Sequence, residues 1–100
     1  MTLIIAGTVR IPPDNLEALR PHMLRMVEAT KAEEGCEQYA YALDVAEPGL
    51  IRIFEVWRGQ AQLDAHFNSP HMAAWREARE KLGLFERRLI AYEVAGRRPL

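Results

Sequence analysis

Residues Leu50 to Trp57 constrain the fold more than any other stretch, because they place apolar side chains on both faces of one predicted strand. Successive residues of a strand point to opposite sides. One side carries Ile51, Ile53, Glu55 and Trp57, and the other carries Leu50, Arg52, Phe54 and Val56. A strand that is apolar on both faces needs a cover on each face. Helices of the same chain can cover one face, so we expect a second subunit to cover the other, sheet against sheet.

The first third of the chain predicts a strand and a helix. Leu3 to Arg10 is rich in β-branched residues and is followed by the proline pair Pro12-Pro13, which ends a strand. Apolar residues then recur at spacings of three and four until about Glu34, and the glycine that follows can end the helix. Pro21 lies inside this helix, so we expect a kink there or a regular start near Arg20.

The rest of the chain predicts a hairpin, two helices and a last strand. A second strand is expected over Glu37–Val45, helices over Gln60–Phe67 and from Ser69-Pro70 to about Leu82, and a last strand within Arg87–Ala95. The turn signal in residues 46–49 makes the second strand and the strand Leu50–Trp57 an antiparallel pair. A serine followed by proline is typical of the first residues of a helix.

This order of elements predicts an α+β fold. A chain that alternates as β-α-β-β-α-β forms the split β-α-β arrangement of ferredoxin-like folds, with a four-stranded antiparallel sheet. One hundred residues suffice for one core, so we expect a single domain over residues 1–100.

Composition excludes several classes of protein. The chain has 13 basic and 14 acidic residues with neither sign concentrated on a predicted face, so we do not expect nucleic acid as a partner. Its one cysteine, Cys36, cannot form an intramolecular disulfide. We find no apolar stretch of membrane-spanning length and no basic leader, so we expect a soluble, cytoplasmic protein without membrane contact.

Several short motifs follow one another in a specific order. They are Glu34-Gly35-Cys36 followed by Tyr39, the strand end Phe54-Glu55-Val56-Trp57, then Ala65-His66-Phe67 and Ser69-Pro70-His71. In this order the chain resembles the antibiotic biosynthesis monooxygenase family over nearly its whole length. The resemblance implies a homodimer that forms a dimeric α/β barrel, with a pocket between each subunit's sheet and helices. It also implies oxidation of quinols or phenols by molecular oxygen without metal, flavin or haem.

Two related branches suggest other activities. The isomerase that processes the phosphorylated autoinducer-2 dione is similar at His66 and at Pro70-His71. A haem-degrading branch has its axial histidine well inside the second long helix. At those interior positions this chain has Trp75 and Arg76, which does not favour haem degradation.

His66 and Glu55 are the candidate catalytic residues. A neutral imidazole can accept a phenolic proton near neutral pH, so His66 is the candidate base. The alternative is a histidine that only packs or is solvated. Glu55 lies between Ile53 and Trp57 on an inward face, where a carboxylate needs a partner or a raised pKa. It could orient His66, accept a substrate hydroxyl, or form a structural ion pair with one of three arginines, Arg76, Arg79 and Arg87.

The candidate substrate-binding residues are mostly aromatic. Planar side chains could stack on a planar substrate, although aromatic residues at these spacings also occur as ordinary core. His71 lies at a helix N-terminus, where the helix dipole disfavours its cation. The candidates are Trp57, Tyr41, Phe67, His71 and Trp75. We expect no metal, because the histidine spacing of five does not suit one helical face and Ser69-Pro70 separates the two residues.

Three hypotheses follow for the function. The first is a cofactor-independent monooxygenase that oxidises a small quinol or polycyclic phenol, with molecular oxygen as the second substrate. The second is an isomerase of a small phosphorylated dione. The third is a dimeric ligand-binding or stress protein without catalytic turnover.

Overall fold

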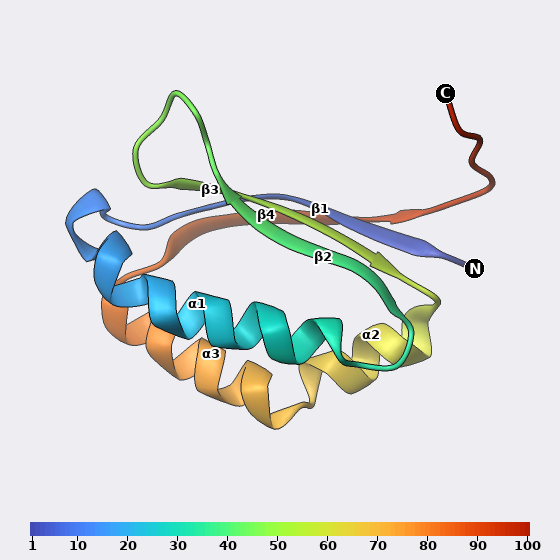
Figure 1. The fold of residues 1–100 in the computed structure, drawn as a ribbon, viewed down its shortest axis with the longest axis horizontal. Coiled ribbons are helices and arrows are strands. Elements are labelled where there is room, and N and C mark those ends of the chain that lie inside the picture. Colours follow the sequence, from blue (N-terminus) through green and yellow to red (C-terminus); the bar gives the residue numbers. More distant parts are fainter.

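Four strands form one antiparallel sheet, and helices cover one of its faces, in a computed structural model that describes all 100 residues (Figure 1). The strand order is β2-β3-β1-β4. The strands are β1 (Leu3–Arg10), β2 (Cys36–Leu43), β3 (Leu50–Trp57) and β4 (Phe85–Glu93). β3 pairs with both β2 and β1, and all the pairings are antiparallel. The ferredoxin-like α+β fold predicted from the sequence is confirmed.

The helices lie on the same side of the sheet (Figure 1). They are α1 (Leu16–Lys31), which follows the short 3-10 turn η1 (Pro13–Asn15), then α2 (Gln60–Phe67) and α3 (Pro70–Leu82). α1 buries Leu19, Met23, Met26 and Thr30, the face that its three-and-four spacing predicts. None of the helices has the length and apolar character needed to cross a membrane.

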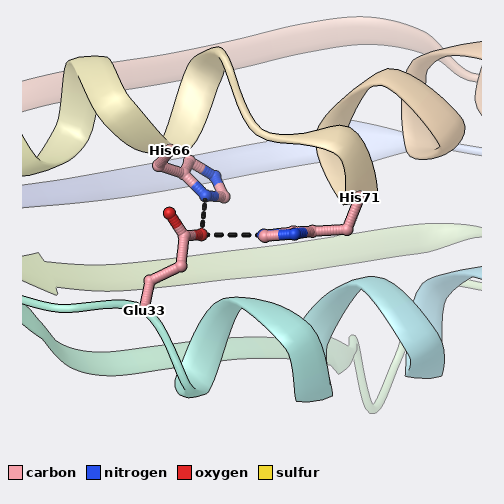
Figure 2. Close-up of side chains that lie close together, drawn as sticks. All are labelled: Glu33, His66 and His71. Atoms are coloured by element: carbon pink, nitrogen blue, oxygen red, sulfur yellow. Dashed lines mark hydrogen bonds and ion pairs between the residues drawn. The ribbon is translucent and has the colours of Figure 1, made fainter.

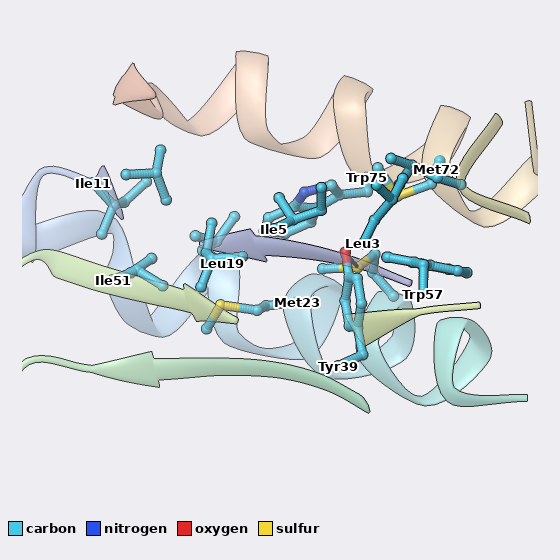
Figure 3. Close-up of a cluster of buried hydrophobic side chains, with 14 residues drawn as sticks. Leu3, Ile5, Ile11, Leu19, Met23, Tyr39, Ile51, Trp57, Met72 and Trp75 are labelled. Carbon is cyan, nitrogen blue, oxygen red and sulfur yellow. Dashed lines mark hydrogen bonds between the residues drawn. The ribbon is translucent and has the colours of Figure 1, made fainter. Parts of the chain in front are cut away.

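The core lies between the sheet and the helices (Figure 3). The inward side of β3 is buried along its whole length, from Ile51 through Ile53 to Trp57, against apolar residues of α1 and α3. Glu55 is the one charged residue on that side of the strand, and only 4% of it is exposed. The central strand therefore carries a carboxylate into an otherwise apolar layer.

The other face of the sheet has no cover within the chain (Figure 1). Strand register places Phe54 beside Ala6, and Ala6 beside Ile90, on this outer face. Ile90, Tyr92 and Phe54 are all exposed there. The expectation of a partner subunit on this face stays a prediction.

The bounds of α1 differ from those predicted. The helix begins at Leu16 rather than near Arg20 and runs through Pro21, so the late start is wrong, and the alternative of a kink at Pro21 stays a prediction. The carbonyl that loses its bond to Pro21 belongs to Glu17; both residues are exposed, so water can replace that bond. The helix also ends at Lys31 rather than at about Glu34, because residues 32–35 form a turn. Because α1 ends at Lys31, Glu33 lies in the turn that follows the helix.

The strand bounds differ from the predicted ones by one or two residues, whereas the predicted helix cap is found. β2 begins at Cys36 and ends at Leu43, and β4 runs from Phe85 to Glu93 rather than within Arg87–Ala95. The start of α3 is as predicted: the Ser69 hydroxyl accepts a hydrogen bond from the Met72 amide, and proline follows the cap. This cap determines where the second long helix begins relative to α2.

Candidate active site

Glu33 joins two histidines from different helices (Figure 2). Its Oε2 atom lies 2.6 Å from Nδ1 of His66 and 2.8 Å from Nε2 of His71. His66 is in the last turn of α2, and His71 is in the first turn of α3. Sequence reasoning selected both histidines but missed Glu33, because it treated that residue as the end of α1. A glutamate two residues before Gly35 gives no sequence signal for this contact.

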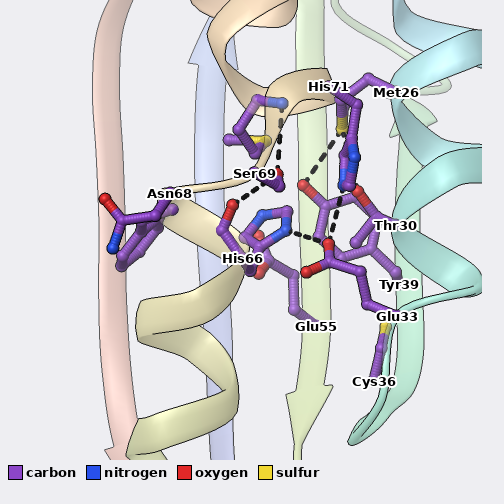
Figure 4. Close-up of polar contacts among 12 residues, drawn as sticks. Met26, Thr30, Glu33, Cys36, Tyr39, Glu55, His66, Asn68, Ser69 and His71 are labelled. Atoms are coloured by element: carbon purple, nitrogen blue, oxygen red, sulfur yellow. Dashed lines mark hydrogen bonds and ion pairs between the residues drawn. The ribbon is translucent and has the colours of Figure 1, made fainter.

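The connection between α2 and α3 brings the histidines together (Figure 4). The Ser69 hydroxyl donates a hydrogen bond of 2.7 Å to the His66 carbonyl and also caps α3. One side chain thereby holds the end of one helix and the start of the next. The rings of His66 and His71 are 6.0 Å apart, centroid to centroid. The interruption between α2 and α3 separates the two histidines along the chain, and in the structure it lets both rings contact the Glu33 carboxylate.

The Glu33 contact selects one tautomer of His66. An ionised carboxylate only accepts hydrogen bonds, so Nδ1 of His66 carries the hydrogen in this pair. Nε2 makes no hydrogen bond within the chain and is left as an acceptor. A histidine oriented in this way by a carboxylate is the usual arrangement of a general base.

His66 is held in its neutral form by its surroundings. Only 1% of the residue is exposed, and burial lowers the pKa of the imidazole, an effect that its hydrogen bond to Glu33 opposes. Its ring packs 4.8 Å from Trp57 and 5.4 Å from Tyr39, between centroids. Burial in an aromatic environment disfavours the cation. A neutral ring with a free Nε2 can take up a proton.

Glu55 has a hydrogen-bond partner, but that partner is not an arginine. Nε1 of Trp57 donates to Oε1 of Glu55 over 2.9 Å. Burial raises the pKa of Glu55 to about 6, and the bond from Trp57 and the charge of Arg87 act in the opposite direction. No arginine forms an ion pair with Glu55, and Glu33 rather than Glu55 orients His66. Glu55 thus has both features expected of a buried carboxylate, a hydrogen-bond partner and a raised pKa.

A cavity of about 290 Å³ opens beside Glu55, between α2 and strands β1 and β4. Its apolar lining includes Leu63, Phe67 and Leu89, and Arg87 is its one cationic residue. The Phe67 ring lies 5.7 Å from the His66 ring. Trp57 contacts His66 and donates to Glu55, so it connects the two candidate catalytic residues. This size is close to the lower limit of about 300 Å³ for small-molecule sites.

The predicted substrate-binding residues do not all line this cavity. Phe67 lines it, whereas Trp57 is fully buried in the core. Tyr41 is half-buried on β2, at the opposite edge of the sheet from β4, where it packs against the core and faces α1. His71 and Trp75 instead line a groove of about 590 Å³ between α1 and α3. Nε1 of Trp75 is buried without a hydrogen-bond partner. The structure therefore separates the predicted set into a cavity residue, core residues and groove residues.

Glu33, His66 and His71 also form a possible set of metal ligands. Their donor atoms, two nitrogens and one oxygen, lie within 4.8 Å of one another. Imidazole and carboxylate are ligands of zinc and of other transition metals. The sequence argument against a metal rested on the spacing of the histidines along one helix, and it does not apply to residues on two helices. In this structure the three groups satisfy one another by direct hydrogen bonds.

Comparison with known sequences identifies one family. Residues 2–78 match the family model described as antibiotic biosynthesis monooxygenase. The chain is 31% identical over 86 residues to the protein named probable quinol monooxygenase YgiN from Escherichia coli, covering 78% of this chain and 83% of YgiN. It is 38% identical over 64 residues to Rv0793 of Mycobacterium tuberculosis, covering 64% of this chain. These sequence matches span 62% of the length of Rv0793 and 63% of another curated relative.

Solved structures share the fold. A crystal structure from Deinococcus radiodurans, described as a "putative antibiotic biosynthesis monooxygenase", superposes with a TM-score of 0.88 at 23% identity. The match covers 100% of this chain and 98% of that one. The structure of Rv0793 superposes with a TM-score of 0.73 at 28% identity, covering 99% and 98% of the two chains.

Proposed function

The chain belongs to the antibiotic biosynthesis monooxygenase family, and from this premise we propose that it is a cofactor-independent monooxygenase. Its substrates would be a small quinol or polycyclic phenol and molecular oxygen. A relative named as a quinol monooxygenase supports the substrate class. The observation that carries the proposal is the hydrogen bond between Glu33 and the buried His66, which leaves a neutral imidazole with a free acceptor nitrogen.

The substrate itself supplies the electrons in this reaction. His66 removes a phenolic proton, and the resulting anion reduces oxygen far more readily than the neutral phenol does. One oxygen atom enters the ring of the quinol and the other leaves as water, so a naphthoquinol becomes a hydroxynaphthoquinone. The four electrons that this requires come from the organic substrate. The protein must supply a base, a dry cavity and a fixed orientation.

Glu55 would act at the other end of the substrate. It lines the cavity, and a carboxyl group with a pKa of about 6 can exist in either protonation state near neutral pH. His66 does not itself line the cavity, but its ring contacts Phe67, which does. We assign Glu55 the role of holding a substrate hydroxyl while His66 takes the proton. Phe67 would pack against the substrate ring, while Trp57 holds the Glu55 carboxylate from the core side.

A second candidate is an isomerase of a small phosphorylated dione. Arg87 lines the same cavity as Glu55, and a phosphate needs a cation near it. The same pair, His66 and Glu55, could move a proton between adjacent carbons. This reaction consumes no oxygen, so oxygen uptake separates the two candidates.

The test is oxygen uptake by chelator-treated protein given reduced naphthoquinols, in wild type and two variants. His66→Asn retains a donor for Glu33 but has no base, and we expect it to lose at least about a hundredfold in rate. His22→Asn is the matched control, because His22 is an exposed histidine of α1 outside the proposed mechanism. Equal uptake in both variants would exclude His66 as the base. No uptake by folded wild type across the panel would exclude the monooxygenase and favour the isomerase or a binding protein.

A further inference from the structure

We propose that the substrate carries an anionic group, which binds in a second cavity formed by Arg76, Arg79 and Arg87 between α3 and β4. The reaction that follows rests on the proposed function, whereas the binding of the anion does not. The cavity has a volume of about 280 Å³, and all three arginines line it.

Arg79 is the most informative of the three. Among the 13 lysine and arginine residues, only Arg10 and Arg79 are not exposed. Arg10 forms ion pairs with Glu47 and Glu86. Arg79 forms no ion pair and no side-chain hydrogen bond, although it is half-buried. An unpaired charge that has lost part of its hydration is unfavourable, so an anion that supplies the missing partner would bind here.

The two arginines near Arg79 add to its positive charge and do not neutralise it. Burial lowers the pKa of Arg79, and the charges of Arg87 and Arg76 lower it further. Arg87 forms no ion pair. Arg76 donates one hydrogen bond of 3.1 Å from its guanidinium group to the Phe67 carbonyl oxygen. Glu80 is the one carboxylate that lines the cavity, and it pairs with none of the three. None of the three guanidinium groups around this small cavity therefore forms an ion pair with a carboxylate of the chain.

The two cavities adjoin at one residue. Arg87 lines both the arginine cavity and the cavity beside Glu55. A ligand whose anionic group lies between Arg79 and Arg87 would extend its remaining atoms toward Glu55 and Phe67. Guanidinium groups bind planar or tetrahedral oxyanions through paired hydrogen bonds, so a carboxylate, sulfonate or phosphate fits this position. A quinol with an acidic substituent would then have a defined orientation in the active site.

The first experiment measures binding without turnover. The probes are 1,4-naphthoquinone-2-sulfonate, the neutral 2-methyl-1,4-naphthoquinone, and dihydroxyacetone phosphate, with dissociation constants from calorimetry. We expect the sulfonate to bind at least about tenfold more tightly than the neutral quinone, as expected for hydrogen bonds between charged groups. Arg79→Met should remove that difference. Arg98→Met deletes the same charge from an exposed, unpaired tail position and should leave it unchanged.

Folding is checked in the same proteins. Because Arg79 is half-buried and unpaired, Arg79→Met should unfold at the same or a higher temperature than wild type in anion-free buffer. Added inorganic phosphate should raise the unfolding temperature of wild type and of Arg98→Met but not of Arg79→Met. Equal binding of sulfonate and neutral quinone, or equal losses in the two variants, would overturn the proposal.

Turnover then separates this inference from the proposed function. Tight, Arg79-dependent binding of the sulfonate with no oxidation of any quinol would support the anion site and exclude the monooxygenase. Oxidation of neutral and sulfonated quinols with the same KM would retain the monooxygenase and exclude the anion site. Selective binding of dihydroxyacetone phosphate over the sulfonate would assign the cavity to a phosphorylated substrate, and the reverse order would assign it to an aromatic acid.

Discussion

The carboxylates of Glu33 and Glu55 have different tasks at the scale of single residues. Glu33 lies outside the helix, contacts two imidazoles and selects the tautomer of His66. Glu55 lies on a central strand, and its one donor is the indole of Trp57. An acid kept partly protonated and a base kept neutral, a few side chains apart, form a combination suited to proton transfer at neutral pH.

Burial of Glu55 should make the protein less stable as pH rises. Its pKa is about 6 in the folded chain against an ordinary value of 4.5, so the folded state binds the proton more tightly. The stability that this contributes is complete below pH 4.5 and is lost as pH rises through 6. Glu55→Gln keeps an acceptor for Trp57 and removes the titration. We expect it to be more stable than wild type by about 2 kcal/mol at pH 8 and to be similar to wild type at pH 4.

Urea unfolding of both proteins between pH 4 and pH 8 measures this difference. His66 has a lowered pKa and therefore the opposite dependence, since its contribution is lost as pH falls. That contribution is common to the two proteins and cancels in the comparison. A constant difference in stability across the pH range would show that Glu55 does not titrate in this window.

At the scale of elements, the junction between α2 and α3 determines the site. Ser69 ends one helix through the His66 carbonyl and begins the next through the Met72 amide. The turn after α1 brings Glu33 to the same place. Three helix ends thus meet at one carboxylate, and no single element contains the site.

Ser69→Ala should loosen this junction. The variant loses the N-cap and the bond to the His66 carbonyl, which we expect to cost about 1 to 2 kcal/mol in the free energy of unfolding. Ser69→Thr keeps the hydroxyl and should lie within about 0.5 kcal/mol of wild type. Denaturant unfolding measures both. Equal stability of the alanine and threonine variants would contradict the proposed role of the hydroxyl.

At the scale of the whole molecule, the outer face of the sheet is the feature that lacks a cover. Phe54, Ile90 and Tyr92 are exposed on it, while helices occupy only the opposite face (Figure 1). We propose that a second copy of the chain packs there, as the apolar character of both faces of Leu50–Trp57 predicts. A homodimer of this kind would also keep water away from the strands that carry the site.

Ile90→Asp should convert the dimer into a monomer, because it places a charge in an apolar interface. Leu24→Asp is the matched control: Leu24 is 56% exposed on α1 and Ile90 is 57% exposed on the sheet. Light scattering after size-exclusion chromatography gives the mass of each. A monomeric wild type, or a dimer that persists in Ile90→Asp, would contradict the sheet-to-sheet arrangement.

Local patterns in the sequence determined the elements and their order. Alternation in Leu50–Trp57, the spacing of apolar residues in α1 and the Ser69-Pro70 start of α3 depend on neighbours a few positions away, so they could be recognised in advance. Strand alternation also selected the buried carboxylate Glu55, whereas His66 was selected for the chemistry of its imidazole and for the family resemblance. The end of α1 was misplaced because the competing turn over residues 32–35 has no comparably strong signal.

Only the tertiary structure decided which charges meet. Glu33 lies 33 residues from His66 along the chain, and Arg79 and Arg87 belong to different elements on either side of one cavity. Such contacts depend on how helix ends pack on the sheet, and hydrophobic periodicity does not encode them. The chain's own pattern thus specified a two-layer fold with an acid buried in it. Packing supplied the partner that orients the histidine and left the arginines unpaired.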